Sequence, residues 1–229
     1  MVDSHQAGGA AMASGQRFQA QVTAWWCARI LLQTRNGQRF DLPATLTPER
    51  IYCETADSID DLRVEFSGNG RVFGQCKRSL SLSTNIESEW ASVLKQFYNE
   101  LEGALPIKVE RRFVLFYENP NRSLRTLDTI LRRYRQLPAG TPLVDAARNQ
   151  QERSLVNTLN TLLDSLQENP ELPNLASRRE ELLRHSYIQQ LQLGVGEAHY
   201  LNVVDPLQYG LLVNPATGEP SSDLIAPSS

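Results

Sequence analysis

The chain has 229 residues, of which 41% are hydrophobic and 21% are charged, and its formal net charge is −3. This length and composition are typical of one globular domain with a good core. No apolar run approaches the roughly 18 residues that a membrane span needs, and the N-terminus lacks the basic and apolar regions of a signal peptide. We therefore expect a cytoplasmic protein that neither spans a membrane nor is secreted.

The three cysteines, Cys27, Cys53 and Cys76, are widely spread and include no CxxC pair. An odd number at such spacing indicates neither a disulfide framework nor a zinc site. All three lie in apolar or strand-like surroundings, so we expect buried free thiols in a reducing compartment.

Helical spacing of apolar residues predicts a first helix at 15–33, after a flexible leader of small residues at 1–14. A loop with Asn36-Gly37 and two prolines follows it. Next come a short strand at 51–54 and an acidic loop. The alternation of 62–66 predicts a half-buried strand, and the turn Ser67-Gly68-Asn69-Gly70 predicts a hairpin with a return strand at 71–80.

The second half of the chain is mostly helical. We predict helices at 87–102, 123–137, 145–168 and 176–184, and an interior strand in the continuous apolar run at 113–117. One or two strands, 187–193 and 199–204, complete the domain at 15–205, and the Pro- and Ser-rich segment 206–229 has the composition of a linker or tail. The predicted fold class is α/β, with a small mixed sheet flanked by helices.

Basic residues gather between 105 and 135, where there are eight Lys or Arg and three Asp or Glu. Residues 136–229, in contrast, have five Lys or Arg and eleven Asp or Glu. Such an excess is found on surfaces that face phosphate, and Arg132 and Arg133 are the candidates there for binding DNA. The same arginines could equally form the solvated side of an amphipathic helix.

Asp61 opens the strand 62–66, and Gln75 and Lys77 lie two residues apart on the return strand. Acidic, amide and ammonium groups on adjacent strands suit metal-assisted hydrolysis of a phosphodiester. Asp61, the amide oxygen of Gln75 and the backbone carbonyl of Cys76 are ligands that Mg²⁺ or Mn²⁺ accepts. Lys77 would orient or deprotonate the attacking water, or neutralise the transition state.

Other residues could assist this site. Glu54, Asp57 and Asp60 are candidates among which spacing does not choose, and Gln19 near the start of the first helix is another. Arg78, next to Lys77, is a candidate for contacting DNA. A plainer interpretation is that Asp61 caps a turn and that Lys77 and Arg78 are solvated residues of an edge strand.

Asp61, thirteen intervening residues and Gln75-Cys76-Lys77, placed after a helix and a strand, resemble the PD-(D/E)xK restriction-endonuclease-like superfamily. The GQRFQAQ helix start, the E…DSIDDL loop and the GQCK strand resemble more narrowly the double-stranded-DNA endonuclease domain of bacterial antiphage defence. That domain is an effector of cyclic-oligonucleotide signalling systems and of large STAND-type NTPases. The resemblance covers about residues 15–135.

The resemblance implies an αβββαβ restriction-endonuclease-like fold, metal binding by Asp61, Gln75 and the Cys76 carbonyl, and a catalytic Lys77. It also implies double-stranded DNA as substrate and a homo-oligomer driven by a C-terminal NTPase or sensor domain outside this chain. Gln75 departs from the usual Glu or Asp and removes one charge from the site. Two hypotheses follow: a metal-dependent DNA endonuclease, or a catalytically silent nuclease-fold module for nucleic-acid binding or assembly.

Overall fold

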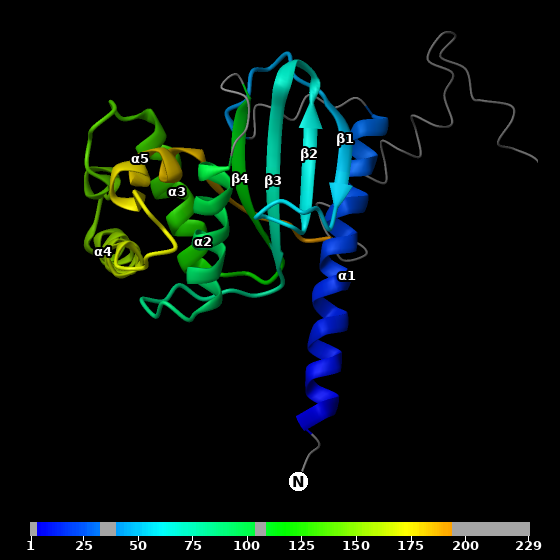
Figure 1. Ribbon diagram of the computed structural model, residues 1–229, viewed down its shortest axis with the longest axis horizontal. Helices are drawn as coiled ribbons and strands as arrows, with labels where there is room; N and C mark the ends of the chain where they lie inside the picture. Colours follow the sequence, from blue (N-terminus) through cyan, green and yellow to red (C-terminus); the bar gives the residue numbers. More distant parts are fainter. Residues whose placement is uncertain (1–3, 33–39, 104–108, 194–229) are drawn as a thin grey trace, which may run out of the picture.

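The computed structural model describes residues 4–32, 40–103 and 109–193, with side chains from Gly15 onward in the first range. Within these ranges the fold is α/β, with a mixed sheet in the order β1-β2-β3-β4-β5 (Figure 1). The strands are β1 (Pro48–Cys53), β2 (Leu62–Phe66), β3 (Gly70–Lys77), β4 (Glu110–Tyr117) and β5 (Ser186–Gln190). The helices are α1 (Ser4–Leu31), α2 (Glu89–Glu102), α3 (Arg122–Gln136), α4 (Gln150–Gln167) and α5 (Leu175–His185).

The direction of the strands sets which residues meet at each edge of the sheet. Strands β1, β2 and β3 pair antiparallel, whereas β4 and β5 run parallel to β3. The carboxyl ends of β1, β3, β4 and β5 therefore lie at one edge together with the amino end of β2. We call this the carboxyl edge and the opposite one the amino edge.

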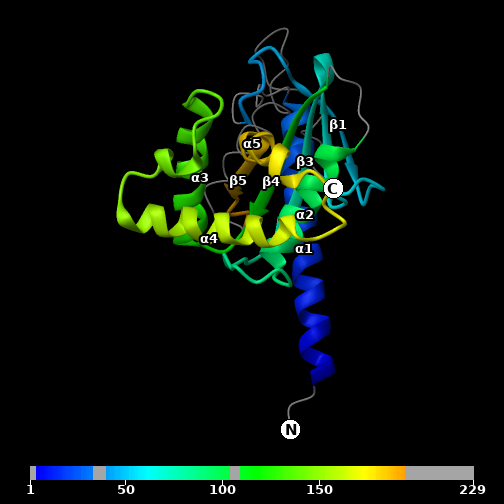
Figure 2. The ribbon, with the colours of Figure 1, turned by 60° about the vertical axis from the view of Figure 1, so that its left-hand side comes forward.

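The helices cover the two faces of the sheet unequally. Helix α1 packs on one face, where Trp26 touches the rings of Phe40, Phe66 and Phe116. Helices α2 to α5 form a second core on the other face, over β3, β4 and β5. The N-terminal half of α1 projects past the carboxyl edge (Figures 1 and 2). No helix in the described ranges is long and apolar enough to cross a membrane.

Several local predictions are confirmed. Strands β2 and β3 form the expected hairpin, although the positive φ angles fall at Gly68 (70°) and Asn69 (72°) and not at Gly70, because residues 67–69 form a short 3-10 turn. Strand β4 is interior, since it pairs with both β3 and β5. The buried face of α3 is the predicted one, comprising Leu124, Leu127, Ile130, Leu131 and Tyr134.

Other predictions need correction or fall outside the described residues. Helix α1 begins at Ser4, before the predicted start at residue 15; alanine is the strongest helix former, and residues 4–14 are rich in it. Cys27 and Cys53 are exposed, not buried, because they lie at the rim between α1 and the edge strand β1. The predicted strand at 199–204 and the segment 206–229 lie outside the described residues.

Candidate active site

Asp61 and Gln75 face each other across the β2–β3 pair at the carboxyl edge. Leu62 pairs with Gly74, so the preceding Asp61 lies opposite Gln75. The Gln75 Nε2 donates a hydrogen bond to Asp61 Oδ2 at 2.7 Å, and the backbone N–H of Cys76 donates to the same oxygen at 2.6 Å. These contacts bring together the acidic and amide groups that the sequence suggested for one site.

Gln75 is buried, with 3% of its surface exposed. Its Oε1 has no hydrogen-bond partner within the described part of the chain, and a buried carbonyl oxygen left in this way costs about 1–3 kcal/mol. Gly74 lets β3 pack closely here, since a Cβ at this position would lie 2.7 Å from Phe116 Cε2 and 2.9 Å from Leu62 Cγ. The strand that carries Gln75 is thus held tightly on both sides.

Burial raises the pKa of the Asp61 carboxyl above its ordinary value, and the neighbouring Asp60 raises it further. The hydrogen bond from the Cys76 N–H, the charge of Lys77 and the bond from Gln75 act in the opposite direction. A half-buried carboxyl with a raised pKa gains from a nearby cation, because a cation favours its charged form. The site is therefore suited electrostatically to a positive ligand.

Lys77 lies on the same face of β3 as Gln75, because side chains two apart on a strand share a face. It is half-buried, and its ammonium makes no hydrogen bond or ion pair with other described residues. Arg78, the next residue, pairs with Glu118 just after β4, with Nε 2.6 Å from Oε2. Lys77 is therefore a cation near Asp61, and Arg78, at the same edge, is neutralised by Glu118.

Helix α1 and the end of β1 close the other side of the site. Gln19 Nε2 donates to the backbone carbonyl of Asp61 at 3.0 Å, and the Glu54 N–H donates to the same carbonyl at 3.4 Å. Glu54 is exposed and adopts a positive φ of 49°, which turns the chain out of β1. Gln19 and Glu54 thus contact Asp61 through its main chain.

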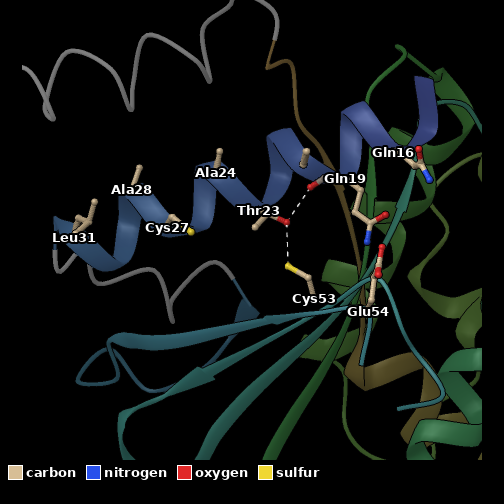
Figure 3. Close-up of a pocket in the computed structure, with 10 residues that line it drawn as sticks. Gln16, Gln19, Thr23, Ala24, Cys27, Ala28, Leu31, Cys53 and Glu54 are labelled. Carbon is tan, nitrogen blue, oxygen red and sulfur yellow. Dashed lines mark hydrogen bonds between the residues drawn. The ribbon is translucent and has the colours of Figure 1, made fainter. Parts of the chain in front are cut away.

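A cavity of about 680 Å³ lies between α1 and the end of β1, with Gln19, Glu54, Cys27 and Cys53 among its lining residues (Figure 3). The Thr23 hydroxyl bridges its two walls, donating to the Gln19 carbonyl at 3.0 Å and lying 3.4 Å from Cys53 Sγ. The cavity reaches the candidate site only through Gln19 and Glu54 and is otherwise largely apolar.

The acidic loop separates the remaining candidate carboxylates. Asp57 is held by Arg63, with Nη1 2.8 Å from Oδ2, while Asp60 is exposed beside Asp61. Sequence analysis missed Glu100 of α2, which is 6% exposed and accepts the Ser58 N–H at 3.1 Å, holding the loop in place. Its position three residues after the buried Phe97 would have indicated that it faces the core.

Several side chains of the site could hold a divalent cation. No three His, Cys, Asp or Glu side chains are grouped for this in residues 4–32, 40–103 and 109–193. Amide and carbonyl oxygens, however, are ligands that Mg²⁺ accepts. The unpartnered Gln75 Oε1 lies on the amide that touches Asp61. The Cys76 C=O points to the same side of β3 as the N–H that meets Asp61. The donor set fits one oxygen-preferring cation.

Arg132 and Arg133 are not brought to this site. Helix α3 begins after the carboxyl end of β4 and runs back along the sheet, so both arginines, in its last two turns, lie toward the amino edge. Arg133 is 16% exposed and forms an ion pair with Glu152 of α4 at 2.8 Å. Arg132 is 69% exposed and pairs with Asp128 at 3.0 Å. The two residues therefore lie away from Asp61, whereas Arg78 follows the carboxyl end of β3.

No protein-family model, curated protein or solved structure has a detectable match to this chain. Function must accordingly be argued from the geometry of the site.

Proposed function

We propose that the chain is a divalent-metal-dependent endonuclease that hydrolyses phosphodiester bonds of double-stranded DNA. The observation that carries the proposal is the contact of Asp61 with the Gln75 side chain and with the backbone N–H of Cys76. Both residues lie on β3, the strand that also carries Lys77. Residues that are 14 and 15 positions apart in the sequence thus meet at the carboxyl edge of the sheet.

Each group has a role in this proposal. Asp61, the Gln75 Oε1 and the Cys76 carbonyl hold Mg²⁺ or Mn²⁺, which when bound supplies Lewis-acid stabilisation of the phosphate and a more acidic water. The Lys77 ammonium, which has no protein partner in the described residues, binds a phosphate oxygen or orients the attacking water. Gln19 positions Asp61 through its main-chain carbonyl. Arg78 binds the DNA backbone near the cut.

The order of elements gives further support. Helix α1, strands β1 to β3, helix α2 and strand β4 follow one another as α-β-β-β-α-β, which is the architecture of the superfamily that the sequence resembles. The same resemblance suggests that the chain acts as an effector domain in antiphage defence, as an oligomer assembled by a partner domain.

The alternative is a nuclease-fold module that binds nucleic acid without cutting it. Two observations favour it: position 75 carries an amide in place of a carboxylate, and no group of three metal-binding acidic, histidine or cysteine side chains occurs among the described residues. An amide oxygen binds a divalent cation more weakly than a carboxylate does, because it carries no net charge.

Nicking of supercoiled plasmid with Mg²⁺, with Mn²⁺ and with chelator tests the proposal. We expect metal-dependent nicking that Lys77→Ala lowers by a factor of about 100 or more, as for the loss of a group acting in the transition state. Lys95→Ala is the matched control, since Lys95 is also half-buried but lies on α2. Equal nicking by the two variants would remove Lys77 from the mechanism.

If the wild-type chain does not nick the plasmid, a second measurement is needed, because the proposed oligomer does not form in a dilute assay. The chain fused to a dimerising coiled coil is assayed in the same way. If the fused protein binds duplex DNA but does not cut it with either metal, the module without catalysis is the correct function.

A further inference from the structure

A polar cavity, distinct from the one between α1 and β1, lies at the amino edge of the sheet. It has a volume of about 300 Å³ and is enclosed by the ends of α3 and α5, the starts of β4 and β5, and the loop before β1. Four arginines line it, Arg112, Arg132, Arg135 and Arg184, against one carboxylate, Asp41. We call it the amino-edge pocket.

Most of these arginines also have a carboxylate partner outside the lining. Each of three is paired through a single nitrogen atom: Arg112 with Glu110 at 3.1 Å, Arg132 with Asp128 at 3.0 Å and Arg184 with Glu180 at 2.7 Å. None of the three is held by a two-nitrogen, two-oxygen contact. Arg112 nevertheless uses all its nitrogens, since it also donates to the carbonyls of Phe40 and Asp41. Arg184 does the same, since it also donates to the carbonyls of Tyr134 and Pro138.

Arg132 and Arg135 are the lining arginines that keep unused nitrogens. They lie three residues apart on α3 and so share a face of the helix. Arg132 uses only Nη2, for Asp128, and Arg135 uses Nε for Asp41 and Nη1 for the Ser186 carbonyl at 2.8 Å. The Nε and Nη1 of Arg132 and the Nη2 of Arg135 make no hydrogen bond with any described residue.

Stabilisation of helix ends does not account for all the arginines of the amino-edge pocket. Basic residues near a helix C-terminus bind its last carbonyls and favour its dipole. Arg184 does so, since its Nη1 donates to the carbonyls of Tyr134 and Arg135. Arg135 donates to the carbonyl of Ser186, the C-cap residue of α5, whereas Arg132 donates to no helix-end carbonyl of the described residues.

Asp41 shows that the pocket already accommodates an oxyanion. Its Oδ2 accepts a hydrogen bond from Arg135 Nε at 3.0 Å and another from the Tyr187 hydroxyl at 3.0 Å. The residue adopts a positive φ of 50°, a conformation that costs energy for aspartate, though less than for most residues. One carboxylate oxygen thus binds where two donors converge, and among the described lining residues Asp41 is the one carboxylate.

We propose that the amino-edge pocket binds a phosphate-class anion, with Arg132 and Arg135 as its principal donors. Guanidinium groups suit phosphate, because their planar donors match its oxygens. The pocket shares no residue with the candidate active site and lies at the opposite edge of the sheet, so the inference does not depend on the proposed nuclease activity.

Calorimetric titration of the chain with pyrophosphate, in chelator and at low salt, tests the site. We expect Arg132→Ala to weaken binding by a factor of about five or more, because it removes one charge-assisted contact. Asp41→Asn should tighten binding, since it removes the one negative charge of the lining while asparagine tolerates the same backbone conformation. Arg153→Ala, an exposed arginine of α4 outside the lining, is the control of equal charge.

The pyrophosphate affinities of the three variants, compared with that of wild type, test the proposed anion site. Equal pyrophosphate affinity in Arg132→Ala and Arg153→Ala would overturn the proposal, as would an Asp41→Asn protein that binds no more tightly than wild type. Circular dichroism of each variant confirms that the fold is intact.

A second arm identifies the source of the phosphate. Binding of a fluorescent 20-base-pair duplex is measured in chelator, alone and in competition with pyrophosphate. If Arg132→Ala weakens duplex binding and pyrophosphate competes, the pocket binds the DNA backbone; if only pyrophosphate binding is lost, it binds a small anion. Either result supports the site.

Discussion

Gln75 donates its amide hydrogen to Asp61 Oδ2 across 2.7 Å, while the oxygen of the same amide is buried without a partner in the described residues. A single side chain therefore orients the carboxylate and presents an unused acceptor beside it. An unsatisfied buried acceptor costs stability, and a bound cation would remove that cost.

Replacement of Gln75 by glutamate would convert this pair into two adjacent carboxylates. Without metal, their mutual repulsion should lower the free energy of unfolding by about 1–3 kcal/mol. With saturating Mn²⁺ the Gln75→Glu protein should gain more in Tm than wild type does, because the cation binds the folded state and meets two negative charges. Thermal unfolding with Mn²⁺ and with chelator measures both effects.

Gln96→Glu, at a half-buried position on α2, is the control for adding a carboxylate elsewhere. If Mn²⁺ shifts the Tm of both variants alike, the cation does not bind at position 75.

Gln19 and Gln21 form a matched pair on α1. Gln19 Nε2 donates to the Asp61 carbonyl at 3.0 Å, and Gln21 Nε2 donates to the Leu193 carbonyl at 3.3 Å. Alanine at either position removes one hydrogen bond and should lower stability by about 1 kcal/mol, measured by urea unfolding. Only Gln19→Ala should also lower DNA nicking, by a factor of about ten, since it alone releases Asp61. Nicking that falls equally in both variants would mean that Gln19 acts through stability.

The two glycines Gly74 and Gly15 should respond in opposite directions to alanine. A Cβ at Gly74 would lie 2.7 Å from Phe116 Cε2, so Gly74→Ala should destabilise the fold by about 1–3 kcal/mol. Gly15 has nothing within 4 Å of the added Cβ and lies inside α1, so Gly15→Ala should stabilise by about 0.5–1 kcal/mol. Chemical denaturation of both variants checks the signs. A Gly74→Ala protein as stable as wild type would mean that the β3–β4 packing is looser than described.

Local patterns predicted much of the fold. The alternation of β2, the apolar stripe of α3 and the placement of Asp61 opposite Gln75 all follow from spacing within about fifteen residues. The partners of charged side chains do not follow in this way: Arg133 meets Glu152 on another helix, and Glu100 meets the loop at Ser58. Such pairs depend on how helices pack on the sheet, so spacing could not show that Arg132 and Arg133 lie toward the amino edge.

Arg78 and Arg133 were both predicted to bind DNA, but the structure gives them different surroundings. Arg78 lies at the carboxyl edge, and its alanine variant should weaken duplex binding and lower the slope of log affinity against log salt by about 1. Arg133→Ala should leave that slope unchanged and instead lower stability by about 1 kcal/mol, because it removes the ion pair with Glu152. Fluorescence anisotropy over a series of salt concentrations gives both slopes. A slope lowered equally by Arg133→Ala would place that residue on the DNA footprint after all.

Glu100 makes the stability of the fold depend on pH. Burial, and secondly the charge of Asp57, raise the pKa of its carboxyl above the ordinary 4.5, while the Ser58 N–H acts in the opposite direction. The folded state therefore keeps the proton at pH values where the unfolded chain has released it. This stabilisation is fully present below pH 4.5 and is lost as the pH rises through the folded-state pKa.

Glu100→Gln stays neutral at every pH and can still accept the Ser58 N–H. Its Tm should thus exceed that of wild type at pH 7, by on the order of a few degrees, and the difference should shrink as the pH falls toward 4. Asp61 and Asp128, whose pKa values burial also raises, contribute equally to both proteins and cancel in the comparison. Glu87→Gln, at an exposed position before α2, should show no such pH-dependent difference. A constant gap between Glu100→Gln and wild type from pH 4 to 7 would show that Glu100 titrates alike in the folded and unfolded states, and that its contact with the loop at Ser58 does not depend on its charge.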